Sequence, residues 1–118
     1  MISFEKEGWI SVWSGMSAED REQDILKSFC GIDYYDVDFQ EILVAPDWEV
    51  IDSTQLFERL SFADSYLDKL IHAATTKGLV KCRYVVAQFN FKYDPKKVTK
   101  PIAPDPVFVG TFRYSVPV

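Results

Sequence analysis

The sequence predicts one α+β domain over residues 1–118, with an antiparallel or mixed sheet and helices packed on it. Three observations support this class. The chain has 118 residues, and a typical domain holds about 100–150 residues. Patterns typical of strands and helices follow each other in the order β-α-β-α-β-β. The chain lacks the repeated βαβ units that would require a parallel sheet.

The first predicted strand covers residues 9–13, where β-branched and aromatic residues are concentrated before Gly15. Because both of its faces carry large apolar side chains, we expect this strand to lie inside the sheet. Residues 17–20 match a capping box, in which a hydroxyl cap is followed by a carboxylate. This motif predicts a helix that continues to about Ser28 and ends at Gly31.

The middle of the chain predicts an ordered loop, a strand and a long helix. Turn-forming and aromatic residues fill residues 31–39, and an apolar strand pattern follows over residues 39–44. Apolar residues then recur at three- and four-residue steps from Leu56 to Ala74, as on an amphipathic helix. We expect a break in this helix near Ser61.

The last third predicts a β-hairpin. Residues 82–93 form the first strand, in which Phe89, Phe91 and Tyr93 alternate with polar residues. The connection over residues 94–106 holds four prolines and three lysines, which indicates an exposed, irregular loop. Residues 107–115 form the closing strand. There we expect Phe108, Phe112 and Tyr114 to share a face and Gly110 to mark a bulge or a close approach.

Charge is divided unevenly along the chain. The net charge is -5, but residues 1–68 hold sixteen acidic and four basic side chains, whereas residues 69–118 hold two acidic and nine basic ones. Such a division tends to produce separate acidic and basic regions, and fields of this kind steer association with a partner. It favours a protein that binds another protein over an enzyme.

The cysteines and the N-terminal residues bear on where the protein acts. Residues 1–15 carry early acids and lack the apolar segment of a secretory signal. We therefore expect a cytoplasmic protein in which Cys30 and Cys82 are free, buried thiols, although two cysteines could form a disulfide in an oxidising compartment. No apolar run approaches the ~18 residues that a membrane span needs, so we expect a soluble protein without membrane association.

Most catalytic arrangements are disfavoured by the residue counts. His72 is the only histidine, so any Ser-His-Asp or Cys-His arrangement would have to use it. We expect it to be an ordinary helix residue near the core edge or surface. Two distant cysteines and one histidine offer no recognised zinc spacing, and the five glycines are spread singly rather than in a phosphate loop. The sequence therefore predicts no catalytic residues and no cofactor.

One group of carboxylates leaves a catalytic alternative open. Oxygen ligands suit Mg²⁺ and Ca²⁺, so a small metal-dependent hydrolase is a competing hypothesis. The segment lacks the central glycine of a calcium loop and a neighbouring lysine or histidine for hydrolysis. The carboxylates are Asp33, Asp36, Asp38 and Glu41.

The same segment is better suited to protein recognition. Tyr34 and Tyr35 supply contact area at low entropy cost, and the acids complement a basic partner. The alternative is that the tyrosines anchor the loop to its own domain. The predicted partner-binding residues are Asp33, Tyr34, Tyr35, Asp36, Asp38 and Glu41.

Direct nucleic-acid binding is disfavoured. Lys92, Lys96, Lys97 and Lys100 border the proline-rich loop beside Tyr93, which is a weak signal for phosphate contact. The domain as a whole is acidic, and lysines in such a loop usually serve solubility. We expect no nucleic-acid partner.

Several segments together resemble the bacterial immunity protein 22 family. In chain order they are Ser11-Val-Trp-Ser-Gly15 with the acidic helix after it, Gly31-Ile-Asp-Tyr-Tyr-Asp-Val-Asp-Phe39, Leu60-Ser-Phe-Ala-Asp-Ser-Tyr66 and Val109-Gly-Thr-Phe-Arg-Tyr114. The Ile-Asp-Tyr-Tyr-Asp element is the most specific of them, and Val37 stands where the family pattern leads us to expect another acid.

The resemblance implies an α+β protein that binds and neutralises a cognate polymorphic toxin inside the producing cell. Such toxins are often nucleases with basic active-site surfaces. An acidic inhibitor that covers such a surface competes with nucleic acid and associates rapidly. A general protein-interaction domain without a toxin partner is the remaining alternative.

Overall fold

The computed structural model describes residues 3–17 and 24–117. These residues form a four-stranded antiparallel sheet of order β2-β5-β1-β6 and a separate two-stranded sheet, β3-β4. The strands are β1 (Glu5–Gly15), β2 (Gln40–Val44), β3 (Ile51–Asp52), β4 (Lys81–Cys82), β5 (Tyr84–Phe91) and β6 (Val107–Arg113). The described α-helices are α1 (Ile25–Phe29), α2 (Ser53–Phe57) and α3 (Leu67–Thr76). The predicted α+β class is confirmed, whereas the element order differs from the predicted one.

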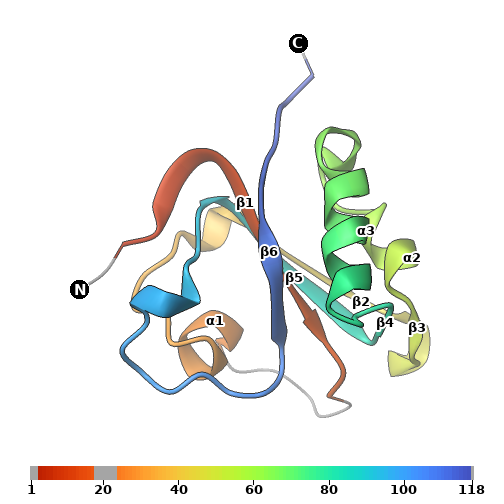
Figure 1. The fold of residues 1–118 in the computed structure, drawn as a ribbon, viewed down its shortest axis with the longest axis horizontal. Helices are drawn as coiled ribbons and strands as arrows, with labels where there is room; N and C mark the ends of the chain where they lie inside the picture. Colours follow the sequence, from red (N-terminus) through yellow and green to blue (C-terminus); the bar gives the residue numbers. More distant parts are fainter. Residues whose placement is uncertain (1–2, 18–23, 118) are drawn as a thin grey trace.

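The four-stranded sheet is the middle layer of the fold (Figure 1). Helices α2 and α3 cover the face on the right of that view, and α1 covers the left face together with the 94–106 connection. Each face has its own apolar core. The helix-side core contains Ile10, Val12 and Leu70, and the loop-side core contains Trp13, Leu26 and Phe91.

Strand β1 lies inside the sheet, as its sequence predicts. It pairs with β5 on one side and with β6 on the other. Ile10 and Val12 are fully buried under the helices, and Trp13 is buried on the opposite face. Large apolar side chains on both faces therefore mark a strand that is covered on both sides.

The predicted hairpin between the last two long strands is wrong. Strand β1 lies between β5 and β6, so these two antiparallel neighbours of β1 do not pair with each other. The 94–106 connection consequently has to cross over β1, and it does so on the loop side of the sheet. Its length allows this crossing, whereas a tight hairpin turn would not.

The predicted alternation in β5 is interrupted at Asn90. This residue adopts a left-handed conformation with φ 55°, which asparagine tolerates better than most residues. The register between β1 and β5 shifts at the same place. As a result Phe89 packs into the helix-side core, while Phe91 and Tyr93 pack into the loop-side core. The three aromatics do not share a face, contrary to the prediction.

A second irregularity, in β6, has the same effect. The pairing with β1 slips between Val12 and Trp13, opposite the predicted bulge at Gly110. The slip places Phe108 on the loop side, where its ring lies 5.4 Å from that of Trp13. Phe112 belongs to the helix-side core. The bulge at Gly110 is confirmed, and it overturns the expectation that Phe108 and Phe112 share a face.

The long helix pattern is divided into α2 and α3, with the break at the predicted place. The chain turns after Ser61 because Phe62 is left-handed, with φ 58°, and the 3₁₀ turn η3 (Ala63–Ser65) leads into α3. Near the N-terminus, α1 is capped by Asp24, whose carboxylate accepts from the Lys27 N–H at 3.2 Å. The predicted capping box falls mainly on residues 18–20, outside the described residues.

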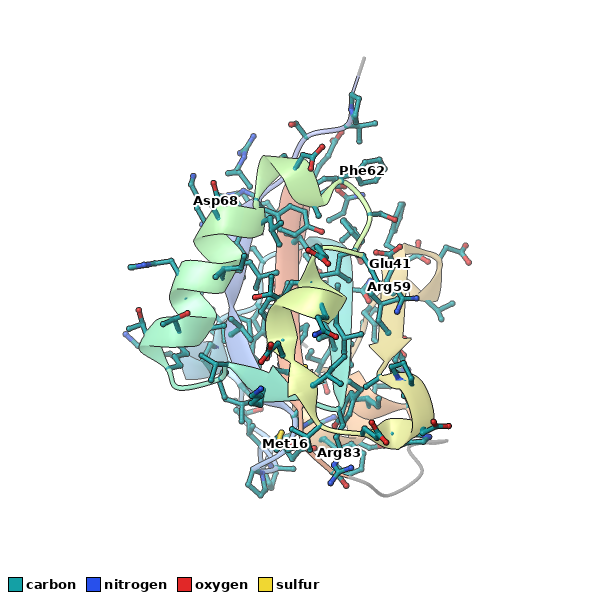
Figure 2. All side chains as sticks on the ribbon, turned by 90° about the vertical axis from the view of Figure 1, so that its right-hand side faces the viewer. Met16, Glu41, Arg59, Phe62, Asp68 and Arg83 are labelled. Atoms are coloured by element: carbon teal, nitrogen blue, oxygen red, sulfur yellow. The ribbon has the colours of Figure 1, made fainter. Side chains whose placement is uncertain are left out.

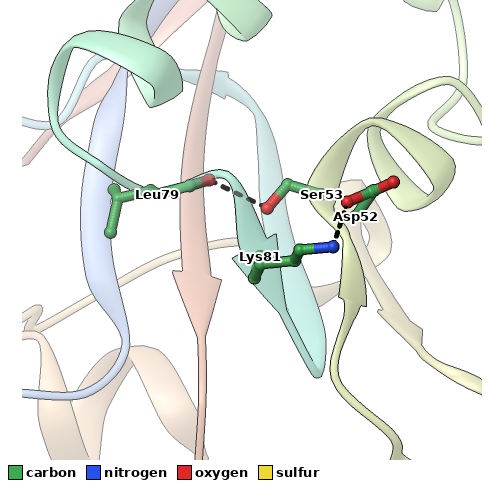
Figure 3. Close-up of polar contacts among 4 residues, drawn as sticks. All are labelled: Asp52, Ser53, Leu79 and Lys81. Atoms are coloured by element: carbon green, nitrogen blue, oxygen red, sulfur yellow. Dashed lines mark hydrogen bonds and ion pairs between the residues drawn. The ribbon is translucent and has the colours of Figure 1, made fainter.

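The small β3-β4 sheet ties α2 to the end of α3 (Figure 3). Ser53, the first residue of α2, donates its hydroxyl to the Leu79 carbonyl at 2.8 Å. Beside it, Lys81 forms an ion pair with Asp52 across the two strands. Backbone pairing and this hydroxyl bond thus hold the start of α2 to the segment that follows α3.

Both cysteines are free and buried, as predicted. Burial raises the pKa of the Cys30 thiol to about 12, and the nearby Asp105 and Asp24 charges add to this rise. Burial also raises the pKa of Cys82. None of the helices in the described part of the chain has the length and apolar character needed to cross a membrane.

Candidate functional site

The predicted binding residues lie on one stretch of chain, but their side chains contact different parts of the domain. Asp33 forms an ion pair with Lys100 of the 94–106 connection. The hydrogen bond from Lys100 holds the pKa of the Asp33 carboxyl below its usual value of 3.8. Asp33 therefore fastens two loops together on the loop side of the sheet.

The two tyrosines have opposite roles. Tyr35 is partly buried against the loop-side core and donates its hydroxyl to Asp24 Oδ1 at 2.8 Å. Burial, followed by this hydrogen bond, raises the pKa of Tyr35 to about 12. Tyr34 keeps 45% of its surface exposed. The anchoring alternative is therefore correct for Tyr35, and Tyr34 is the tyrosine that can reach a partner.

Asp36 organises the loop ahead of β2. Its carboxylate accepts from the Asp38 N–H at 3.0 Å and so caps the 3₁₀ turn η1 (Val37–Phe39). Its carbonyl accepts from the side chain of the buried Gln88 at 2.7 Å. These contacts leave the Asp38 side chain exposed on a turn that is fixed to the sheet.

Glu41, on β2, points toward the break between α2 and α3. Its carboxylate accepts hydrogen bonds from the N–H and the hydroxyl of Ser61. Tyr66 donates to the Ser61 carbonyl at 2.7 Å from the other side. Figure 2 shows Glu41 and Phe62 on neighbouring segments at this end of the sheet. Glu41 thus positions the turn that presents Phe62.

The four carboxylates do not form a cation site. Asp33 is paired with a lysine, and the carboxylates of Asp36 and Glu41 accept hydrogen bonds from backbone N–H groups and a hydroxyl. Within residues 3–17 and 24–117, no group of three or more histidine, cysteine or acidic side chains is arranged to hold a metal. The described structure therefore gives these carboxylates roles in holding loops and turns together.

Asp38 and Glu41 instead border an aromatic groove of about 360 Å³. The groove lies between η1, β2 and the turn at Phe62. Its walls are the aromatic side chains of Phe39, Phe62, Phe89 and Tyr114, and its remaining lining residues are Gln40, Ser61 and Val116. We call this feature the acid-rimmed groove. A hollow of about 530 Å³ shares Phe39 and Tyr114 with it and continues toward Glu5, Lys6 and Glu7.

The aromatic walls of the groove form a packed array. The rings of Phe62 and Tyr114 are stacked, with centroids 6.0 Å apart, and Phe89 meets Tyr114 edge-on at 5.0 Å. The backbone of Phe62 is left-handed, and its side chain remains 40% exposed. Such a conformation costs a non-glycine residue about 1–3 kcal/mol and is concentrated at functional sites. An exposed aromatic ring held in this way is a candidate contact residue.

No protein-family model, curated protein or solved structure matches this chain. The geometry of the chain and its sequence resemblance to the immunity protein 22 family are therefore the two indications of its function.

Two of the six residues predicted from the sequence, Asp38 and Glu41, border the groove, whereas its aromatic walls were not predicted. Phe39, Phe62 and Tyr114 come from three distant parts of the chain, and the strand and helix patterns assigned them to core or loop. The sequence did contain a local signal for Phe62, because Ser61 and Phe62 interrupt the apolar helix pattern. An aromatic residue at such a break is not needed for the helix core. That these three segments meet at one groove could be seen only from the arrangement of the strands in the sheet.

Proposed function

We propose that this chain is an immunity protein that binds a cognate toxin in the cytoplasm and covers its active site with the acid-rimmed groove. The groove is the observation that carries the proposal. It combines exposed aromatic surface, which is typical of the energetic centre of protein interfaces, with carboxylates at its border. This combination suits a basic protein surface.

The charge around the groove supports a basic partner. Two carboxylates, Asp38 and Glu41, border the groove itself. They belong to a stretch, residues 33–49, that contains six acidic side chains and neither lysine nor arginine, although one of these acids, Asp33, is paired with Lys100. A nuclease-type toxin presents cations to the phosphates of its substrate, so an acidic partner competes for the same surface. Long-range attraction between the two surfaces would accelerate their association and make it sensitive to salt. The resemblance to the immunity protein 22 family favours the same partner class.

Co-expression with the toxin domain encoded beside this chain tests the proposal. We expect the cells to survive, the two proteins to copurify, and association to slow as salt rises. Persistent toxicity despite soluble expression of the chain would contradict the proposal. Binding that is independent of salt would contradict the electrostatic part of it.

Charge reversal locates the interface. Asp38→Lys is the sharper variant, because Asp36 also caps η1 and its replacement would disturb the loop. We expect Asp38→Lys to weaken toxin binding about tenfold, which corresponds to about 1.4 kcal/mol. Asp68→Lys on α3 makes the same change of charge away from Glu41 and Phe62 (Figure 2) and should alter affinity by less than about threefold. If the two variants changed toxin affinity equally, the interface would not be at the acid-rimmed groove.

A further inference from the structure

Strand β2 has an open outer edge. It pairs with β5 over five residues in continuous register, from Gln40 opposite Gln88 to Val44 opposite Tyr84. It is the terminal strand of the sheet, and in Figure 2 it lies at the right-hand margin, with none of the described strands beyond it. The pairing contains no bulge, and the strand contains no proline or lysine that would discourage pairing with another chain.

The backbone groups on this edge can be assigned from the neighbouring hydrogen bonds. The Ala45 N–H donates to the Arg83 carbonyl at 2.8 Å, next to the last β2–β5 pair. In an antiparallel pair, the residues that bond to the neighbouring strand alternate with residues whose backbone groups point away from it. The N–H and C=O groups of Ile42 and Val44 therefore point outward, while those of Leu43 bond to β5.

The outward residues also present apolar side chains. Ile42 is 44% exposed and Val44 is 37% exposed, whereas Leu43 packs against the helix-side core. Ile42 and Val44 pair with Val86 and Tyr84 of β5, so they lie on the loop side of the sheet. The edge thus offers two outward-pointing backbone positions and an apolar strip beside them.

Carboxylates flank this edge at both ends. Asp36 and Asp38 precede β2, and Asp47 and Glu49 follow it. Two arginines approach the region, and one of them, Arg83, donates to the backbone carbonyls of Met16 and Trp48. The other, Arg59, is exposed and belongs to the segment that joins α2 to Phe62 (Figure 2).

The acids at the two ends of β2 indicate which kind of chain can pair with this strand. If a second copy paired antiparallel through β2, the acids before one strand would face the acids after the other. Like charges facing each other across strands are destabilising, so the pattern disfavours a homodimer. A partner strand with cations at both ends would meet opposite charges at both ends.

We propose that β2 accepts an extended segment of the partner protein as an additional strand of the sheet. The segment carries apolar residues over Ile42 and Val44 and lysine or arginine at its two ends. Main-chain hydrogen bonds contribute affinity, and the flanking charges contribute selectivity. This inference rests on the proposed function only in taking the partner to be a protein, and it adds the mode by which that partner is held.

A peptide probe tests the mode directly. The probe is Lys-Lys-Val-Thr-Val-Thr-Val-Lys-Lys at millimolar concentration, and the measurement is amide hydrogen exchange followed by NMR. In the free chain, we expect the Ile42 and Val44 amides to exchange rapidly and the Leu43 amide slowly. The probe should slow exchange at Ile42 and Val44 by about tenfold and leave Leu43 unchanged. A probe with glutamate in place of lysine should produce no protection.

A matched pair of variants tests the backbone contribution. Ile42→Thr keeps the outward N–H, and Ile42→Pro removes it. The proline variant should still fold, because this N–H has no partner within the sheet and edge strands tolerate proline there. We expect Ile42→Pro to bind the lysine probe about tenfold more weakly than Ile42→Thr. Circular dichroism and the exchange rate of the β1 amides verify that both variants are folded.

The possible outcomes separate this inference from the proposed function. Unprotected Ile42 and Val44 amides in the presence of the lysine probe overturn the inference. So does equal binding of the lysine and glutamate probes, or protection that rises with protein concentration alone and therefore indicates a second copy. If the toxin binds while these amides stay unprotected, the inference fails and the proposed function stands. If the probe protects the edge but the toxin does not bind, the inference stands and the proposed function fails.

Discussion

The two edges of the main sheet, β2 and β6, are built in opposite ways. Along β6, α3 packs beside the strand (Figure 1), and Lys77 on the helix end donates to the Phe108 carbonyl at 3.0 Å. The bulge at Gly110 further interrupts a regular edge. Strand β2 has a regular register, and none of the helices within residues 3–17 and 24–117 packs against it as α3 packs against β6.

The difference indicates which edge is available to a partner. A bulge, a covering helix and a lysine are usual means of preventing unwanted strand pairing. On β6 they occur together, whereas β2 is bounded by acids at its two ends. Because these acids lie outside the strand, they do not block the outward backbone groups of Ile42 and Val44. They favour a basic partner over an acidic one. The β6 edge therefore serves stability, and the β2 edge is suited to selective recognition.

The largest contrast is expected in the unfolding free energy of alanine variants. Phe112, on β6, is buried in the helix-side core, so Phe112→Ala should cost about 3–5 kcal/mol. Ile42, on β2, is nearly half exposed, so Ile42→Ala should cost less than about 1 kcal/mol. Urea unfolding measures both values. Similar losses would show that the two edges contribute equally to stability.

An intermediate effect is expected at the link between β2 and the turn before η3. Ser61→Ala removes the hydroxyl that donates to the Glu41 carboxylate. Hydrogen bonds to charged groups contribute about 1.5–3 kcal/mol when buried, and partial exposure reduces this to about 1–2 kcal/mol here. Thermal unfolding measures the loss. Ser28→Ala, at an exposed position, is the control and should stay within about 0.5 kcal/mol of the parent chain.

The smallest effect concerns the ion pair between Asp33, in the loop before β2, and Lys100 of the 94–106 connection. The pKa of Asp33 is lowered, so the Lys100 ion pair contributes above the ordinary pKa of 3.8 and is lost as pH falls through the lower folded value. Lys100→Met should therefore raise the Asp33 pKa toward 3.8, as measured by NMR titration of its carboxyl carbon. Lys97→Met, on the same connection, should leave that pKa unchanged. An unshifted Asp33 in the Lys100 variant would contradict the pairing.

The sequence predicted elements well where local pattern determines them. The two-sided apolar pattern at residues 9–13 correctly predicted a central strand, and the interrupted pattern near Ser61 correctly predicted a helix break. The expected faces of the aromatics in β5 and β6 were wrong, because the irregularity at Asn90 and the bulge at Gly110 each reverse the side of the sheet that the next aromatic faces. The bulge at Gly110 was itself expected, but its effect on Phe108 was not. A period-two pattern cannot reveal such a reversal, because the residue types are the same on either face.

The order of strands could not be obtained from local pattern either. Strands β5 and β6 are neighbours in the chain, but β1 lies between them in the sheet. The residue pattern within one strand does not identify the strands that pair with it. The candidate site shows the same limitation. The partners of Asp33 and Tyr35, which are Lys100 and Asp24, come from other segments. Their pairing converts two predicted contact residues into loop anchors, while Tyr34 and Asp38 remain exposed.

The burial of the two cysteines has a practical consequence for measuring these interactions. Thiol reagents react with an accessible thiolate, and the side chains of Cys30 and Cys82 lie inside the two cores. A cysteine introduced at an exposed position, as in Tyr34→Cys, would therefore be the preferred site of maleimide attachment in the folded chain. A fluorophore placed there would stand beside the acidic loop, and its emission could follow partner association in real time without removing either native thiol.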